Sequence, residues 1–217
     1  MAETTAAKKS EFDFTAFVAK HQKNILIGIG GVIVASAAVW IVIASHNLKE
    51  SRGEVALGGA ERSFYSGNNQ LAETDLSQVV RRYSGTAAGA QASILLAKTY
   101  FNLGKPAQGV AALREALNSG ASKPFRSDML ALVGAGYENL GKFDSAATAY
   151  SEAASASMLL ADKEAFQADQ ARALADGGKR TEALKIWQGI AAREDSPLAP
   201  LAKVRVGELT AAPAKGS

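Results

Sequence analysis

The sequence predicts an all-α chain: a single transmembrane helix, then a solenoid of helical hairpins, then a C-terminal capping helix. Two observations predict this fold class. The uncharged apolar run 25–45 has the length and composition of a membrane span. Beyond it, apolar residues follow helical spacing and short motifs recur at a constant interval, which is typical of stacked hairpins.

Composition narrows the classes of function. The 217 residues are 47% hydrophobic, enough for a sizeable core, and the 24 basic and 21 acidic residues are interspersed along the chain. A net charge of +3 without basic runs argues against nucleic acid as a partner. The chain has no cysteine, and His21 and His46 flank the apolar run on opposite sides. We therefore expect no metal site, no cofactor, no catalytic residue and no enzyme activity.

The run 25–45 is long enough to cross the roughly 30 Å hydrocarbon core at about 1.5 Å per residue. The alternative is a cleaved secretory signal, for which the small residues 35–37 would supply a cleavage site. Apolar residues continue past that site from Val39 to Ile43, and Trp40 suits a membrane interface. We expect an uncleaved anchor that contacts the lipid bilayer through residues 25–45.

Basic residues on the two sides of the anchor predict its orientation. Four precede it and two follow it closely, namely Lys8, Lys9, Lys20 and Lys23, then Lys49 and Arg52. Since positive charge favours the cytoplasmic side, we expect the N-terminus in the cytoplasm and the residues after His46 outside it. The predicted domains are a cytoplasmic tail with an interfacial helix (1–24), the transmembrane helix (25–45), the repeat domain (46–209) and a disordered tail (210–217). A capping box at residues 10–13 would start the interfacial helix.

Glycines mark the interval of the repeats. The pentapeptides FNLGK and ENLGK place Gly104 and Gly141 37 residues apart. One further step reaches Gly178, and one step back reaches Gly67. We expect each glycine to take the left-handed conformation at the end of the first helix of a hairpin.

Side-chain sizes and prolines agree with the repeat interval set by the glycines. Small residues are expected to let paired helices approach, and large ones to fill the space between hairpins: Tyr100, Tyr137 and Trp187 are interpreted as such core residues. The prolines are expected at helix starts and between hairpins: Pro106 opening a second helix, Pro124 between hairpins, and Pro197 in the first turn of a capping helix that runs to about Leu209.

This pattern resembles the tetratricopeptide repeat, whose unit is 34 residues, with longer linkers at 119–124 and 155–162. The whole chain resembles the YfgM-like ancillary subunits of the Sec translocon, through the lead 17–24, the anchor, and the segments 83–90 and 196–203. That resemblance implies a single-pass protein of the bacterial inner membrane with periplasmic repeats. It implies protein partners, either Sec translocon subunits or a membrane-anchored chaperone.

The resemblance also implies a binding groove lined by the first helix of each hairpin. Mapped onto this sequence, the groove positions are Phe64, Tyr65, Ile94, Lys98, Phe101, Asn102, Asp128, Glu138, Asn139 and Arg172. Asn102 and Asn139 have a second interpretation as helix C-caps. Mixed charge with a few aromatic rings suits an extended or helical segment of another protein.

Two hypotheses of function follow. The first is a membrane-anchored adaptor or chaperone-like subunit associated with protein export, which binds partner proteins in the groove. The alternative is a structural scaffold subunit of another envelope or membrane complex. Partner identity separates them, and the sequence motifs describe architecture only.

Overall fold

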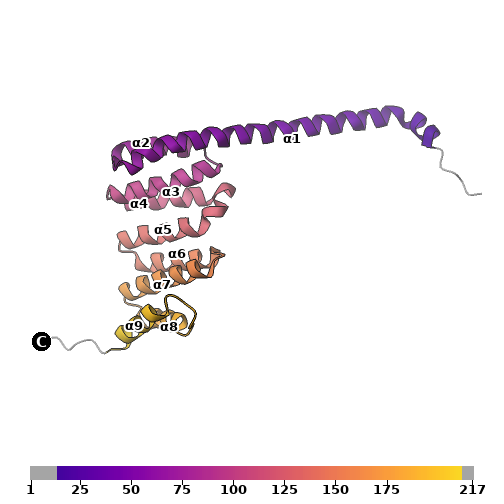
Figure 1. Ribbon diagram of the computed structural model, residues 1–217. Coiled ribbons are helices and arrows are strands. Elements are labelled where there is room, and N and C mark those ends of the chain that lie inside the picture. Colours follow the sequence, from indigo (N-terminus) through magenta and orange to yellow (C-terminus); the bar gives the residue numbers. More distant parts are fainter. Residues whose placement is uncertain (1–13, 212–217) are drawn as a thin grey trace, which may run out of the picture. The chain divides into compact units, whose positions relative to one another are not determined.

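A computed structural model describes residues 14–211 of the chain. Within this range it contains nine α-helices, one 3-10 helix and no strand (Figure 1). The all-α fold class is therefore confirmed. The chain divides into two compact units, Met1–Leu48 and Lys49–Ser217. The expected capping box at 10–13 lies outside the described residues.

The described part of the first unit is the N-terminal part of helix α1, which extends from Phe14 to Tyr65. Its apolar side chains are exposed to solvent, with 69% of Val34 and 70% of Trp40 accessible. Among the described residues, α1 is the one helix long and apolar enough to cross a membrane. Length and composition alone also fit a core helix or a signal sequence, but a core helix would be buried, and this segment is not.

The second unit is a stack of helices in which each one packs against the next, from the C-terminal part of α1 to α9 (Figure 1). The elements after α1 are α2 (Asn69–Arg82), α3 (Ala87–Asn102), α4 (Pro106–Leu117), the 3-10 helix η1 (Gly120–Phe125), α5 (Arg126–Asn139), α6 (Phe143–Ala156), α7 (Leu160–Asp176), α8 (Arg180–Ala191) and α9 (Ala199–Thr210). Short connections make successive helices antiparallel, so the unit is a solenoid of hairpins.

The four repeat glycines occupy the hairpin turns. Gly67, Gly104, Gly141 and Gly178 have φ values of 77°, 69°, 68° and 81°, in the left-handed region that favours glycine. In the last three turns the following lysine donates its N–H to a carbonyl five residues back, as Lys105 does to Tyr100 at 2.8 Å. The predicted turn conformation is confirmed.

Two of the three prolines with an expected position lie where the repeat pattern predicts them. Pro106 is the first residue of α4, as predicted, and Pro124 lies in η1 between α4 and α5. The prediction for Pro197 is wrong by two residues, because α9 begins at Ala199. The Ser196 side chain accepts a hydrogen bond from the N–H of Leu198 at 3.2 Å, which holds residues 196–198 in a turn before the helix starts.

Three apolar clusters follow one another along the stack: the first joins α1, α2 and α3, the second α3 to α6, and the third α6 to α9. Alanines with no exposed surface, such as Ala97 and Ala146, allow the close approach of paired helices. Trp187, 4% exposed, fills the third cluster as predicted.

Candidate functional site

The expected groove residues come from α1, α3, α5 and α7, the first helices of the hairpins. Six of them are exposed: Tyr65, Lys98, Asn102, Asp128, Asn139 and Arg172. The other four, Phe64, Ile94, Phe101 and Glu138, are half-buried. Ile94 and Phe101 pack against the second apolar cluster, so only part of each side chain is accessible.

The structure brings two pairs of these residues into contact. The rings of Phe64 and Tyr65 meet edge to face with centroids 5.2 Å apart. The Arg172 guanidinium lies 3.4 Å from the Glu138 carboxylate. Asn102 instead donates to the Asn69 side chain at 3.3 Å, so it joins α3 to α2. Of the remaining residues, Lys98 on α3 and Asp128 and Asn139 on α5 are separate exposed positions.

Glu138 and Arg172 belong to a polar network across three helices. The Tyr150 hydroxyl on α6 donates to Glu138 on α5 at 2.9 Å, and Arg172 on α7 donates to Asp169 at 2.9 Å. Burial, reinforced by the hydrogen bond to Glu138, raises the pKa of the Tyr150 phenol. Burial also raises the pKa of the Asp169 carboxyl, against the opposing effect of Arg172. The network therefore joins α5, α6 and α7, and engages Glu138 and Arg172 within the fold.

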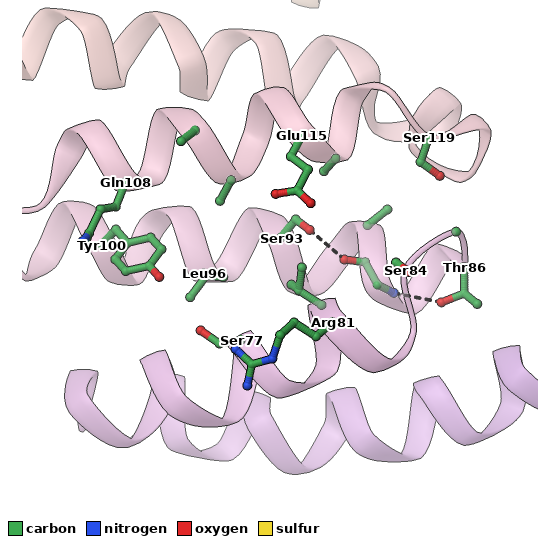
Figure 2. Close-up of a pocket in the computed structure, with 17 residues that line it drawn as sticks. Ser77, Arg81, Ser84, Thr86, Ser93, Leu96, Tyr100, Gln108, Glu115 and Ser119 are labelled. Carbon is green, nitrogen blue, oxygen red and sulfur yellow. Dashed lines mark hydrogen bonds between the residues drawn. The ribbon is translucent and has the colours of Figure 1, made fainter.

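A cavity of about 600 Å³ lies between α2, α3 and α4. Figure 2 shows Arg81 of α2 and Glu115 of α4 on its opposite walls, with Tyr100 and Gln108 at one end. Much of the surface between them consists of small residues from α3 and α4: Gly89, Ala90, Ser93, Ala111, Ala112 and Ala116. Such a lining lets another chain approach the helices closely.

The polar groups at the far end of the cavity have partners within the fold. Thr86 caps α3 by accepting from the N–H of Gly89 at 3.1 Å, and its hydroxyl donates to the Tyr83 carbonyl at 2.6 Å. The Ser93 hydroxyl donates to the Gly89 carbonyl at 2.9 Å (Figure 2). Arg81 and Glu115, both exposed, are the charged groups of the lining.

The cavity and the expected groove use opposite sides of α3. At 3.6 residues per turn, Lys98 lies about half a turn away from Ser93 and Leu96, which line the cavity. Sequence reasoning missed this cavity. Tyr100 was interpreted as a core residue; it packs against the first apolar cluster and also lines the cavity. The small residues of α4 were visible in the sequence, but their spacing also fits ordinary contact between helices.

Within the described part of the chain, no group of three or more histidine, cysteine, aspartate or glutamate side chains is placed to hold a metal ion.

Comparisons with known proteins agree with the architecture. The profile of a family described as "Tetratricopeptide repeat-like domain" matches residues 42–168, more than half of the chain. No curated protein matches significantly. Among solved structures, the repeats of a Podosopora anserina protein described as a kinesin light chain superpose with a TM-score of 0.60 at 21% identity, covering 74% of this chain and 86% of that one. A substituted form of the same repeats gives 0.60 at 20% identity, with 74% and 85% covered. At such identity the likeness shows the fold alone.

Proposed function

The chain belongs to the family of tetratricopeptide repeat-like domains, and from that premise we propose that it is a membrane-anchored adaptor that binds other proteins. Stacked helical repeats generally serve as protein-interaction modules, because each hairpin adds side chains to a continuous surface. The observation that carries the proposal is the match over 42–168, which begins inside the apolar run 25–45. We assign the protein no catalytic role and no cofactor.

The proposed binding surface is the groove face of the first helices. Lys98 on α3 and Asp128 on α5 support this assignment, because they carry opposite charges and are exposed on successive first helices. Asn139 adds a further exposed polar side chain on α5. A partner segment with complementary charges would bind along them, and the edge-to-face pair Phe64 and Tyr65 would offer an aromatic contact at one end.

The cavity between α2, α3 and α4 is the second candidate surface for the same function. Its volume of about 600 Å³ and its lining of small residues favour a helix of a partner protein that fits between α2 and α4. Arg81 and Glu115 would then orient that helix by their opposite charges.

The membrane anchor is part of the proposal. The exposed apolar side chains of α1 support it, since a helix with side chains such as Val34 and Trp40 exposed requires an apolar environment. The excess of lysines before the run favours a cytoplasmic N-terminus and repeats on the periplasmic side of a bacterial inner membrane.

Association with protein export is the leading cellular role. The resemblance to the Sec-associated ancillary subunits supports it, and tethering would raise the local concentration of a weak binder near the translocon. The alternative is a scaffold subunit of another envelope complex. Purification of the full chain in mild detergent separates the two roles: recovery of Sec subunits or of a membrane-anchored chaperone supports the first, and a different stoichiometric assembly contradicts it.

The two candidate surfaces are separated by matched variants. Lys98→Glu with Asp128→Lys changes exposed charges of the groove, whereas Ala111→Trp narrows the cavity from an exposed wall position. Lys185→Glu with Glu182→Lys on α8 is the control, because it makes the same exchange of exposed charges away from both surfaces. Arg172 is avoided, because a change there breaks its contacts with Glu138 and Asp169.

Partner recovery is the measurement. If the groove binds, only the Lys98 and Asp128 variant loses the partner. If Ala111→Trp alone loses it, the groove assignment is wrong and the cavity is the site. Equal loss with the α8 control contradicts both surfaces.

A further inference from the structure

We propose that one edge of the second unit rests on the surface of an anionic phospholipid bilayer, with Met158, Leu159 and Leu160 inserted among the lipid headgroups. The edge is formed by the α2–α3, α4–α5 and α6–α7 connections (residues 83–86, 118–125 and 157–159), and is called the connecting edge below. The inference rests on the proposed membrane anchor and adds a second, separate lipid contact to it.

The three connections share one edge because successive helices are antiparallel. The C-terminal ends of α2, α4 and α6 lie together, and the turns at Gly104, Gly141 and Gly178 lie at the other ends of the helices (Figure 1). The stack therefore has two distinct edges, one made of glycine turns and one made of longer, more varied connections.

The first residues of the second unit are held at the connecting edge. The Lys49 ammonium donates to the Ser84 carbonyl at 2.6 Å, and the Glu50 carboxylate accepts from the N–H groups of Ala87 and Ala88 at 3.0 Å each. Lys49 follows the apolar run 25–45 by only a few residues. The chain therefore passes from the apolar run to the connecting edge within a few residues.

The connecting edge carries an exposed apolar segment. Met158 is 99% exposed, Leu159 64% and Leu160 58%, and the three residues are consecutive at the start of α7. Elsewhere in the second unit, large apolar residues are mostly buried in the three clusters. Three adjacent exposed apolar side chains on a unit whose other large apolar residues are mostly buried indicate a contact with an apolar environment.

Basic residues lie at all three connections of the same edge. Arg81 and Arg82 end α2, Lys123 lies in η1, Arg126 begins α5 and Lys163 lies in the first turn of α7, and all five are exposed. The acidic residues within two positions of these five in sequence are Asp128, Asp162 and Glu164, so positive charge predominates. Positive charge around an inserted apolar segment fits anionic headgroups and water at the bilayer surface.

Charge also limits the surface. The next connection, between α8 and α9, carries the exposed acidic pair Glu194 and Asp195, which anionic lipid would repel. We therefore assign the contact to the connections from α2 to α7 and exclude the C-terminal end of the stack.

Lipid quenching in the full chain tests the contact. Because the chain has no cysteine, Leu159→Cys takes one environment-sensitive fluorophore, and Lys142→Cys beside the glycine turn at Gly141 takes the same label as the control. The protein is reconstituted in vesicles of phosphatidylglycerol and phosphatidylcholine in equal parts, with a quencher on a fraction of the lipid. We expect blue-shifted emission and quenching several times stronger at position 159 than at position 142. Equal quenching at the two positions overturns the proposal.

A second pair of measurements separates the edge contact from the membrane anchor. A label at Ala38→Cys reports the anchor itself. Quenching at position 38 without quenching at position 159 overturns the edge contact and leaves the anchor proposal intact. Absence of quenching at both positions overturns the edge contact and the anchor. Lys123→Glu with Lys163→Glu is expected to weaken quenching at 159 and not at 38. If the label at 159 is unquenched by lipid and becomes protected when native membrane proteins are added, the segment docks a protein and the lipid proposal is wrong.

Discussion

The carboxylate of Glu50 accepts a hydrogen bond from the backbone N–H of Ala88 at 3.0 Å. Its second oxygen accepts from Ala87 at the same distance, so one side chain of α1 satisfies two amides in the first turn of α3. A carboxylate at a helix N-terminus also meets the positive end of the helix dipole. The hairpin that contains α1 is therefore joined to the next one by a cap supplied from a different helix.

Glu50→Ala is expected to destabilise the second unit by about 1–2 kcal/mol, because two charge-assisted hydrogen bonds to the α3 terminus are lost. Denaturant unfolding of the full chain in mild detergent, followed by circular dichroism, measures the change. Glu54→Ala is the matched control, since it removes the same charge one turn later from an exposed position. Equal losses for the two variants would mean that the cap contributes nothing beyond general electrostatics.

Gly89→Ala is expected to destabilise the second unit by about 1–3 kcal/mol, because a Cβ there would overlap the carbonyl oxygen of Tyr83. This oxygen belongs to the backbone, so it cannot move aside as the end of a flexible side chain could. Gly189→Ala on α8 meets no atom within 4 Å and should stabilise by about 0.5–1 kcal/mol through helix propensity. A lower melting temperature for Gly89→Ala and a higher one for Gly189→Ala would support the tight α2–α3 connection. A higher melting temperature for both variants would show that the α2–α3 connection moves to accommodate the added Cβ.

Tyr150→Phe removes the hydrogen bond to Glu138 and should cost about 1–2 kcal/mol at pH 8. The pKa of this phenol is raised above its ordinary value of 10.0, so its contribution is complete below pH 10 and is lost as pH rises from there. The stability difference between wild type and Tyr150→Phe should therefore narrow above pH 10. Urea titrations at several pH values test this, and Tyr65→Phe is the control for removal of a hydroxyl from an exposed tyrosine. A constant difference would contradict the assignment.

Membrane topology is expected to have a cytoplasmic N-terminus. Single cysteines at Ser10 and Ser157 lie on opposite sides of the apolar run and meet no native thiol. A membrane-impermeant thiol reagent applied to the outer side of the cytoplasmic membrane should label Ser157→Cys alone. Labelling of Ser10→Cys alone would reverse the orientation and place the repeats in the cytoplasm.

Much of the fold was predictable because its signals are local. A glycine in the left-handed conformation follows each first helix, so the number of residues from Gly104 to Gly141 equals the length of one repeat. Pro106 likewise fixed a helix start within one short segment. The start of α9 was misjudged at Pro197, because the Ser196 side chain holds an additional turn there that no proline rule reports.

The site was less predictable because its contacts join distant parts of the chain. The Glu50 cap links residues 37 and 38 positions apart, and nothing around Glu50 in the sequence marks it as a capping residue. The network of Glu138, Tyr150 and Arg172 needs three helices at once. The cavity depends on small side chains from α3 and α4 that face α2, a combination that only the stacked helices reveal.

The equal spacing of the turn glycines has a consequence for how such a chain can change length. Lys105 and Lys142 each follow a left-handed glycine and donate to a tyrosine carbonyl in the same way. Removing residues 105–141 would therefore connect Gly104 to Lys142 through a turn of the same geometry, with α3 followed directly by α6. A gene that encodes such an array can gain or lose one whole module by in-frame duplication or deletion, and the helices on either side keep their register.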